Sequence, residues 1–280
     1  MKKILVPTDF SDIANNALEE AIHIAKRLKT EIVLLTVVEE GSSGSIRITG
    51  EMMQKDVREN IYFINLVEKS KERLAELINK YSNEVTIYPE IRMGNPFYSI
   101  SDIVADHDVD FIVMGTRGSS GLEELIIGSN TEKVVRHAKC PVLTVHDKSA
   151  YNYKDIIYAT SFDDDEKGLI DLLKKFQGTY NSTVHLVWVN TPNNFERDKL
   201  TKIRMRQFIE KHNLSNCTLN IYSDISEEDG IISFAEEKNA DMIAMITHGR
   251  TGFAHMIAGS IAEDVVNHTK RPVLTFSVNR

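Results

Sequence analysis

Cysteine, positive charge and long apolar runs are all scarce in this sequence. Its 280 residues include two cysteines, Cys140 and Cys217, and neither belongs to a CxxC pair or a Cys/His cluster, which excludes a disulfide framework. A formal net charge of −8 argues against nucleic acid or an anionic membrane as the main partner. No apolar run approaches the ~20 residues of a membrane span, and Ile4–Val6 is too short for a signal peptide. We therefore expect a soluble, cytoplasmic protein.

Several motifs that carry common chemistries are also missing. There is no GxxxxGK[ST] loop, no GxGxxG after the first predicted strand and no GxSxG, which argues against P-loop enzymes, dinucleotide oxidoreductases and serine hydrolases. No HExxH or His cluster indicates a metal site. The sequence therefore predicts no catalytic residue and no metal ligand.

The sequence repeats itself at a constant separation of 131 residues. Met114–Gly118 leads to Gly128–Ser129, and Ile246–Gly249 leads to Gly259–Ser260 with the same spacing. In both copies an apolar run ends at a glycine turn, and a helical pattern follows nine residues later. A strand followed by glycines and a helix N-terminus leaves backbone N–H groups available to an anion, usually a phosphate. The repeat predicts a duplicated α/β domain with a candidate phosphate site in each half.

Apolar strand patterns alternate with helical patterns along the whole chain. This alternation predicts a parallel sheet covered by helices on both faces in each half, over residues 1–146 and 153–280. The polar segment His146–Asn152 is the expected connection. The expected strands are Lys3–Val6, Glu31–Val38, Val85–Ile91, Phe111–Met114 and Val142–Val145, then Ile156–Ala159, Val184–Val189, Thr218–Tyr222, Met242–Thr247 and Val273–Phe276. The helices expected in the first half are Ser11–Leu28, an apolar stripe from Val57 to Tyr81, Phe97–His107 and Ser129–Ala138.

The first half is 21 residues longer than the second between its second and fourth strands. The surplus begins with Gly41–Gly44, at the carboxyl edge of the sheet where open α/β sheets bind ligands. A lid or partner-docking element and an ordinary surface insertion are both compatible with it, and the second is favoured.

Three sequence features together resemble the universal stress protein family. They are Pro7-Thr8-Asp9-Phe10-Ser11 after the first strand, the spacing G-x2-G-x9-G-S from Gly115 to Ser129, and Pro141-Val142-Leu143 at the last strand. The resemblance covers nearly all of residues 1–146 and, more weakly, 153–277, so the chain resembles a tandem member. It implies Rossmann-like domains of the HUP, or adenine nucleotide alpha hydrolase, type, each with a five-stranded parallel sheet in the order 3-2-1-4-5. It also implies that the two halves pair through their last strands, and leaves dimerisation of the whole chain open.

One branch of this family binds ATP, and the first half keeps the residues of that branch. The resemblance implies an adenine nucleotide, ATP with magnesium, as the ligand. Asp9 and the backbone of Val37 would contact adenosine, and the helix start at Gly128 would face the phosphates. Arg117 would supply positive charge. The complete set of binding candidates is Pro7, Thr8, Asp9, Val37, Met114, Gly115, Arg117, Gly118, Gly128, Ser129 and Asn130.

The second half departs from this pattern at two positions. Ser161 stands where the first half has Asp9, and Ile246 stands where it has Gly115. We interpret the β-branched Ile246 as filling space that a nucleotide would need. Nucleotide binding is therefore expected in the first half rather than in the second.

Structural explanations compete with the functional ones at several positions. Ser129-x-x-Glu132 and Ser260-x-x-Glu263 both read as capping boxes, which would explain both serines without a phosphate. Asp9 could serve only to cap the turn into the first helix. Arg117 and Arg250 could simply be solvated. His137 and His268 suit the last turn of a helix, facing its dipole.

Three functions are compatible with these observations. The first is a regulatory or stress-response factor that binds ATP in its first half. The second is a slow ATPase or a nucleotidyl-transfer enzyme. The third is an interaction module that binds no nucleotide. Phosphoryl transfer needs a metal-binding carboxylate and a group that positions the attacking atom, and the sequence offers no clear candidate for either, which favours the first function.

Overall fold

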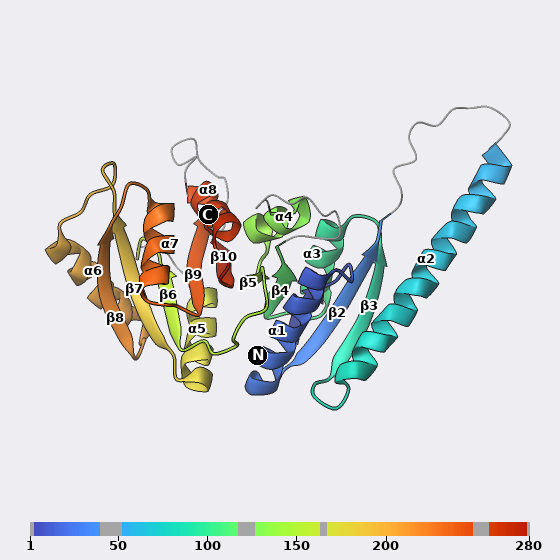
Figure 1. Cartoon of the computed structure of the whole chain (residues 1–280), viewed down its shortest axis with the longest axis horizontal. Coiled ribbons are helices and arrows are strands. Elements are labelled where there is room, and N and C mark those ends of the chain that lie inside the picture. Colours follow the sequence, from blue (N-terminus) through green and yellow to red (C-terminus); the bar gives the residue numbers. More distant parts are fainter. Residues whose placement is uncertain (1–2, 40–51, 117–126, 163–166, 249–257, 279–280) are drawn as a thin grey trace.

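The computed structural model describes residues 3–39, 52–116, 127–162, 167–248 and 258–278, and every structural statement below refers to them. Their strands form one sheet of ten, in the order β3-β2-β1-β4-β5-β10-β9-β6-β7-β8. Figure 1 shows the two halves side by side along the longest axis of the molecule, with α2 beyond one end of the sheet and α6 at the other.

The first half has five parallel strands connected through helices. Its elements are β1 (Lys3–Pro7), α1 (Asp12–Leu28), β2 (Glu31–Val38), α2 (Met52–Tyr81), β3 (Ile87–Met93), α3 (Pro96–Asp106), β4 (Phe111–Gly115), α4 (Ser129–His137) and β5 (Val142–Val145). The strand order is 3-2-1-4-5, as the resemblance implied. The chain reverses its winding direction between β1 and β4, and this is where open α/β sheets bind their ligands.

The second half repeats the same order of elements. They are β6 (Asp155–Ala159), α5 (Lys167–Tyr180), β7 (Thr183–Asn190), α6 (Asp198–His212), β8 (Cys217–Ser223), α7 (Glu227–Glu237), β9 (Met242–His248), α8 (Ala258–His268) and β10 (Val273–Val278). All expected strands are present, most of them one or two residues longer than the sequence pattern suggested.

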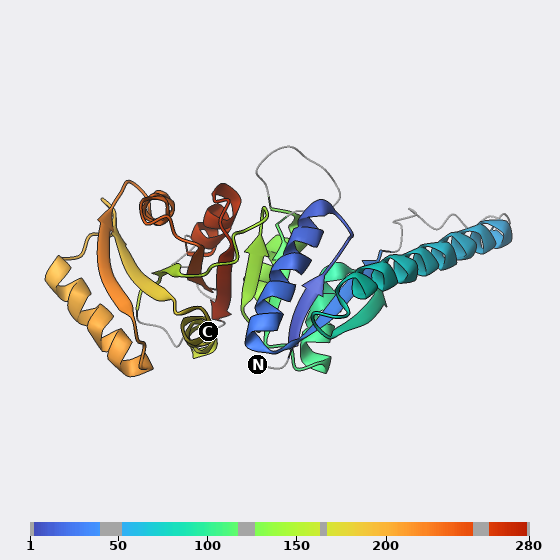
Figure 2. The same cartoon turned by 60° about the horizontal axis from the view of Figure 1, so that its bottom comes forward.

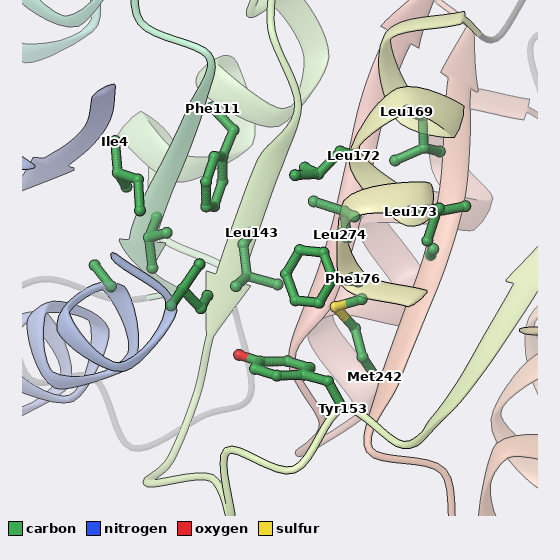
Figure 3. Packing of buried hydrophobic residues seen from close by; sticks show 14 of the residues in the cluster. Ile4, Phe111, Leu143, Tyr153, Leu169, Leu172, Leu173, Phe176, Met242 and Leu274 are labelled. Carbon is green, nitrogen blue, oxygen red and sulfur yellow. The ribbon is translucent and has the colours of Figure 1, made fainter. Parts of the chain in front are cut away.

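The two halves meet at an antiparallel pair of strands. Leu143 of β5 lies opposite Leu274 of β10. Thr144 Oγ1 donates a hydrogen bond of 3.2 Å to the carbonyl of Val273 across the same pair. Leu143 and Leu274 also share one hydrophobic cluster with Tyr153 and residues of α5 (Figure 3). The seam is therefore part of the core.

Side chains of the buried strands alternate between two helix layers, as the pleat of a strand requires. Ile4 and Val6 of β1 belong to the cluster that includes α1, whereas Leu5 between them belongs to the cluster that includes α3 and α4. All three are fully buried. Burying a side chain of this size contributes about 1.5–3 kcal/mol, so this continuous apolar run stabilises both layers at once.

Local signals set the ends of α1 and α3. Ser11 caps α1 by accepting a hydrogen bond from the amide of Ala14, and Lys29 ends the helix in the left-handed conformation. Asn95 caps α3, and Pro96 follows at its first position. A capping side chain is common at a helix start because it accepts a hydrogen bond from a backbone N–H that has no partner within the helix. Proline is common at the first position because it has no N–H that would need a partner there.

The long helix α2 is only partly covered. Leu74 and Tyr81 are buried, but Ile61 and Ile64, on the same predicted stripe, are 54% and 60% exposed. The amino-terminal part of the helix extends away from the sheet (Figures 1 and 2). A helix of 30 residues is about 45 Å long, more than the edge of the sheet can cover. The predicted apolar stripe is therefore not buried at Ile61 and Ile64.

Candidate functional site

The candidate site lies where β1 and β4 end beside each other. The amide of Thr8, just beyond β1, donates to the carbonyl of Leu35 at 2.7 Å. The amide of Thr116, just beyond β4, donates to the carbonyl of Val145 at 3.0 Å. The amide of Gly128 then donates to Thr116 at 2.8 Å, which fixes the start of α4 against the end of β4.

The turn after β1 is held by its own side chains. Thr8 is 6% exposed, and its Oγ1 accepts a hydrogen bond of 3.0 Å from the amide of Phe10, whose φ is 65°. Asp9 is exposed, and its Oδ1 accepts from the amide of Ser11 at 3.0 Å. Asp9 thus has the turn-stabilising role considered for it, and its exposed carboxylate lies at the edge of the sheet.

Helix α4 begins without a side-chain cap. Gly128 is the N-cap residue, with φ −62° and ψ 142°, and Ser129 is the first helical residue. The predicted capping box at Ser129 is therefore wrong, and Glu132 pairs with Arg136 at 3.0 Å instead. In the second half, Ser260 is the third residue of α8, and its side chain lies outside the described part of the chain. No hydroxyl or carboxylate of the described chain caps the first turn of α4, and its amides suit an anion.

Thr131 joins the helix to the strand end, and sequence reasoning missed it. Its side chain is buried, and Oγ1 donates to the carbonyl of Gly115 at 3.0 Å. The position equivalent in the repeat is Ala262, which has no hydroxyl. This difference between the halves was the signal that could have identified Thr131.

Gly115, one of the predicted binding candidates, makes room for helix α1. A Cβ at this position would lie 2.7 Å from Cγ2 of Ile13 and 3.3 Å from that residue's backbone carbonyl. The glycine lets α1 approach the end of β4, and a side chain here points into the helix layer. The equivalent Ile246 is 7% exposed and belongs to the main core cluster. Interpreting Ile246 as a plug over the second site was therefore mistaken, because it packs inward.

An arginine crosses the corresponding edge of the second half. Arg204 of α6 donates from Nη1 to the carbonyl of Ser161 at 3.3 Å, and its guanidinium lies 5.1 Å from the ring centre of Trp188. It also pairs with Glu196. Ser161 follows β6 as Asp9 follows β1, so these contacts lie where the first half has its candidate adenosine end. The second site is thus crossed by an ion pair that the sequence analysis did not identify.

The repeat-equivalent arginine of the first half is arranged differently. Arg73 of α2 is exposed, and its guanidinium lies 4.7 Å from the ring centre of Phe10. Separations of this size are typical of cation–π contacts. The two halves therefore differ at this edge: Arg73 lies over the ring of Phe10, whereas Arg204 bonds the backbone of Ser161 and pairs with Glu196.

The structure brings most of the predicted candidates to one region. Pro7, Thr8 and Asp9 end β1, Met114 and Gly115 end β4, and Gly128, Ser129 and Asn130 start α4, while Val37 lies near the end of the adjacent β2. Met114 is buried in the hydrophobic cluster that includes residues of α3 and α4, so its side chain belongs to the core beneath the site. Arg117 and Gly118 lie outside the described residues, as do Gly249 and Arg250 of the repeat.

The two histidines in final helical turns contact groups away from this site. His137 meets Phe97 edge to face, and His268 hydrogen-bonds Glu228. Within the described ranges, no group of His, Cys, Asp or Glu residues could hold a metal ion.

A model of the universal stress protein family matches residues 1–146 and 223–277, which is well over half of the chain. The chain belongs to the universal stress protein family. Among curated members, one from Methanocaldococcus jannaschii is 33% identical over 150 residues, covering 51% of this chain and 81% of the relative. A second from the same organism is 35% identical over 159 residues, covering 53% of this chain and 97% of the relative.

Solved structures extend the likeness to both halves of this universal stress protein. The crystal structure of a universal stress protein from Archaeoglobus fulgidus aligns with a TM-score of 0.77 over 98% of each chain, at 22% identity. A putative universal stress protein from Pseudomonas aeruginosa aligns with a TM-score of 0.68 over 99% of this chain and 93% of its own length, at 16% identity. These matches establish the tandem fold. Among the helices that the structure describes, none is long and apolar enough to cross a membrane.

Proposed function

We propose that the first half binds ATP and that the chain acts as a nucleotide-responsive regulatory factor in the stress response. The observation that carries this proposal is the start of α4. It is a helix N-terminus with a glycine N-cap and no side-chain cap from the described residues, at the point where the sheet reverses its winding. Such a terminus combines available amides with the positive end of the helix dipole, and both favour phosphate.

The residues around α4 support a nucleotide rather than a bare anion. The end of β2 at Val37 lies on the side of β1 away from β4, and the exposed Asp9 follows β1 itself. This gives a polar acceptor for ribose or base at one end and amides for phosphates at the other. The exposed Ser129 and the half-buried Asn130 add polar groups at the phosphate end. Magnesium would arrive with the nucleotide, held chiefly by phosphate oxygens.

The second half has a different role in this proposal. Arg204 and Glu196 cross its corresponding edge, so we propose one nucleotide per chain. Residues 1–146 form the nucleotide-binding unit, and residues 153–280 form a unit that pairs with it through β5 and β10. The proposed working location is the cytoplasm. Pairing of two whole chains into a homodimer stays a prediction.

Matched substitutions in the two halves test this proposal. Gly128→Val should weaken Mg·ATP binding by about tenfold or more, which corresponds to at least about 1.4 kcal/mol. A β-branched side chain there crowds the amides and replaces a good N-cap residue with a poor one. Gly259→Val changes the equivalent position of the second half and should leave the affinity within about twofold. Isothermal titration of the full chain measures the dissociation constant and the number of sites.

The titration separates the three functions considered above. One nucleotide per chain, lost only with Gly128→Val, supports the proposal. Two nucleotides per chain would contradict the role given to Arg204. No binding by the unmodified chain would favour an interaction module. Steady release of phosphate in the same samples would identify an enzyme.

A further inference from the structure

Ile127 precedes the first-half N-cap glycine, yet its side chain belongs to the core of the second half. It is 7% exposed and packs in a cluster whose other buried members come from β6, β7, α7, the turn at Ala240, β9, α8 and β10. Ile127 is the one first-half residue among the described members of that cluster. Ile127, two residues before α4, is therefore anchored in the opposite half.

The backbone of Ile127 is fixed by the second half as well. Its amide donates a hydrogen bond of 2.7 Å to Oδ1 of Asn267, in the last turns of α8. The next amide along the chain, that of Gly128, donates to Thr116 within the first half. Two consecutive amides thus hold the start of α4 between the two halves.

The body of α4 is also attached to the second half. Arg136 makes two parallel hydrogen bonds to Glu263 of α8, with Nη2 and Oε2 2.5 Å apart. Ser277 of β10 donates to the carbonyl of Arg136 at 2.8 Å. Bidentate arginine–carboxylate pairs fix orientation as well as distance, so α4 and α8 are held in one relative geometry.

These contacts are not symmetric between the halves. The repeat equivalent of Asn267 is Arg136, and the equivalent of Ile127 is Ala258. Alanine is too small to fill the space of an isoleucine, and arginine has no side-chain acceptor for an amide. A side chain of the second half therefore holds the backbone beside the candidate nucleotide site of the first half, and the sequence provides no equivalent contact from the first half to the second.

We propose that Asn267 is a positioning residue for the nucleotide site of the first half. By holding the amide of Ile127, it fixes where the neighbouring Gly128 and the first-turn amides of α4 point. The inference rests on the proposed binding of ATP at α4. Because coupling between sites is reciprocal, bound nucleotide in turn stabilises the hydrogen bond between Asn267 and Ile127. The strength of this contact between the halves thereby depends on whether the first half has bound nucleotide.

Asn267→Ala in the full chain tests the role of this residue. The variant should bind Mg·ATP about fivefold more weakly, at the lower end of typical coupling between sites. The amide of Ile127 should exchange with solvent faster, as measured by NMR without nucleotide. The urea midpoint of unfolding should fall only slightly, because this hydrogen bond is part-buried and water can replace the lost amide of Asn267.

Glu263→Gln is the matched control on the same helix. It weakens the ion pair with Arg136 but leaves the contact between Asn267 and Ile127 in place. We expect a lower urea midpoint, unchanged exchange at Ile127 and an ATP affinity within about twofold of the unmodified chain. Affinity that falls in both variants in proportion to lost stability would reduce Asn267 to a docking contact and overturn the inference. Unchanged affinity in Asn267→Ala would overturn it too, while an unmodified chain that binds no ATP would end both proposals.

Discussion

Glu20→Gln should remove a decline in this protein's stability that one buried carboxyl causes as the pH rises toward neutrality. We expect Glu20 to lower the free energy of unfolding by about 3 kcal/mol as the pH rises from about 4.5 through about 7, while His23, whose pKa burial lowers, contributes the opposite slope. The variant should show little of this decline. Urea denaturation at a series of pH values measures the difference.

The expectation follows from where the Glu20 carboxyl lies. It is on α1, fully buried, and accepts hydrogen bonds from Tyr153 and, at 2.6 Å, from Ser149, both in the segment that connects the halves. Tyr151 and Tyr180 face the same region, and His23 of α1 stacks on both. Burial raises the pKa of Glu20 to about 7, and the hydrogen bond from Ser149 opposes this only in part.

The sign of the effect is fixed by that raised pKa. The folded chain binds the Glu20 proton more tightly than the unfolded chain, whose carboxyl titrates near 4.5. Protonation therefore stabilises the fold below the unfolded pKa, and the contribution is lost as the pH rises through the folded pKa. Glutamine keeps an acceptor and adds a donor, but carries no charge at any of these pH values.

Glu19→Gln provides the control at the adjacent residue. A hydrogen bond from Lys148 is the main cause that lowers the pKa of Glu19, with smaller contributions from Tyr81 and Lys80. Its contribution to stability is present above its unfolded pKa and is lost as the pH falls, which is the opposite slope. A decline above pH 4.5 that persists in Glu20→Gln, or disappears in Glu19→Gln, would show that Glu20 is not its source.

Gly115→Ala should lower the free energy of unfolding by about 2 kcal/mol. The new methyl carbon would lie 2.7 Å from Cγ2 of Ile13, and backbone atoms of the same residue prevent α1 from yielding easily. Overpacking of this kind typically costs about 1–3 kcal/mol. Thermal or urea unfolding of the full chain measures the change.

Gly178→Ala is the control for the added methyl group. Gly178 lies in α5, with no atom within 4 Å of a built Cβ. Alanine should stabilise the helix there by up to about 1 kcal/mol, because glycine is the poorer helix former. If both substitutions changed the free energy of unfolding by the same amount, contact with Ile13 would not be the reason why glycine is needed at position 115. A double variant Gly115→Ala with Ile13→Ala should recover part of the loss caused by Gly115→Ala alone.

The architecture was predictable from local patterns. Strands such as Glu31–Val38 were found because buried parallel strands are continuous apolar runs. The start of α1 was predicted to within one residue because apolar residues recur along it at helical spacing. The gathering of Asp9, Gly115 and Gly128 near one edge follows from the topology, since the carboxyl ends of parallel strands meet there.

The errors concern contacts between residues far apart in the sequence. The inward direction of position 115 depends on how closely α1 approaches β4, and no local pattern records that distance. Arg204 reaches Ser161 from 43 residues away. The cap of α4 was misplaced by one residue because Gly128 uses its amide for Thr116, a choice that tertiary structure makes.

The outermost strands of the sheet have a consequence for assembly. The seam uses up the apolar strands β5 and β10, and it leaves β3 and β8 at the two ends. β3 contains Pro89, which has no N–H to offer, together with the charged Glu90 and Arg92. Charged residues and proline on a terminal strand discourage further strands from adding to it. Joining two repeats in one chain thus pairs the apolar strands β5 and β10 with each other and leaves at the β3 end a strand unsuited to further edge-to-edge pairing.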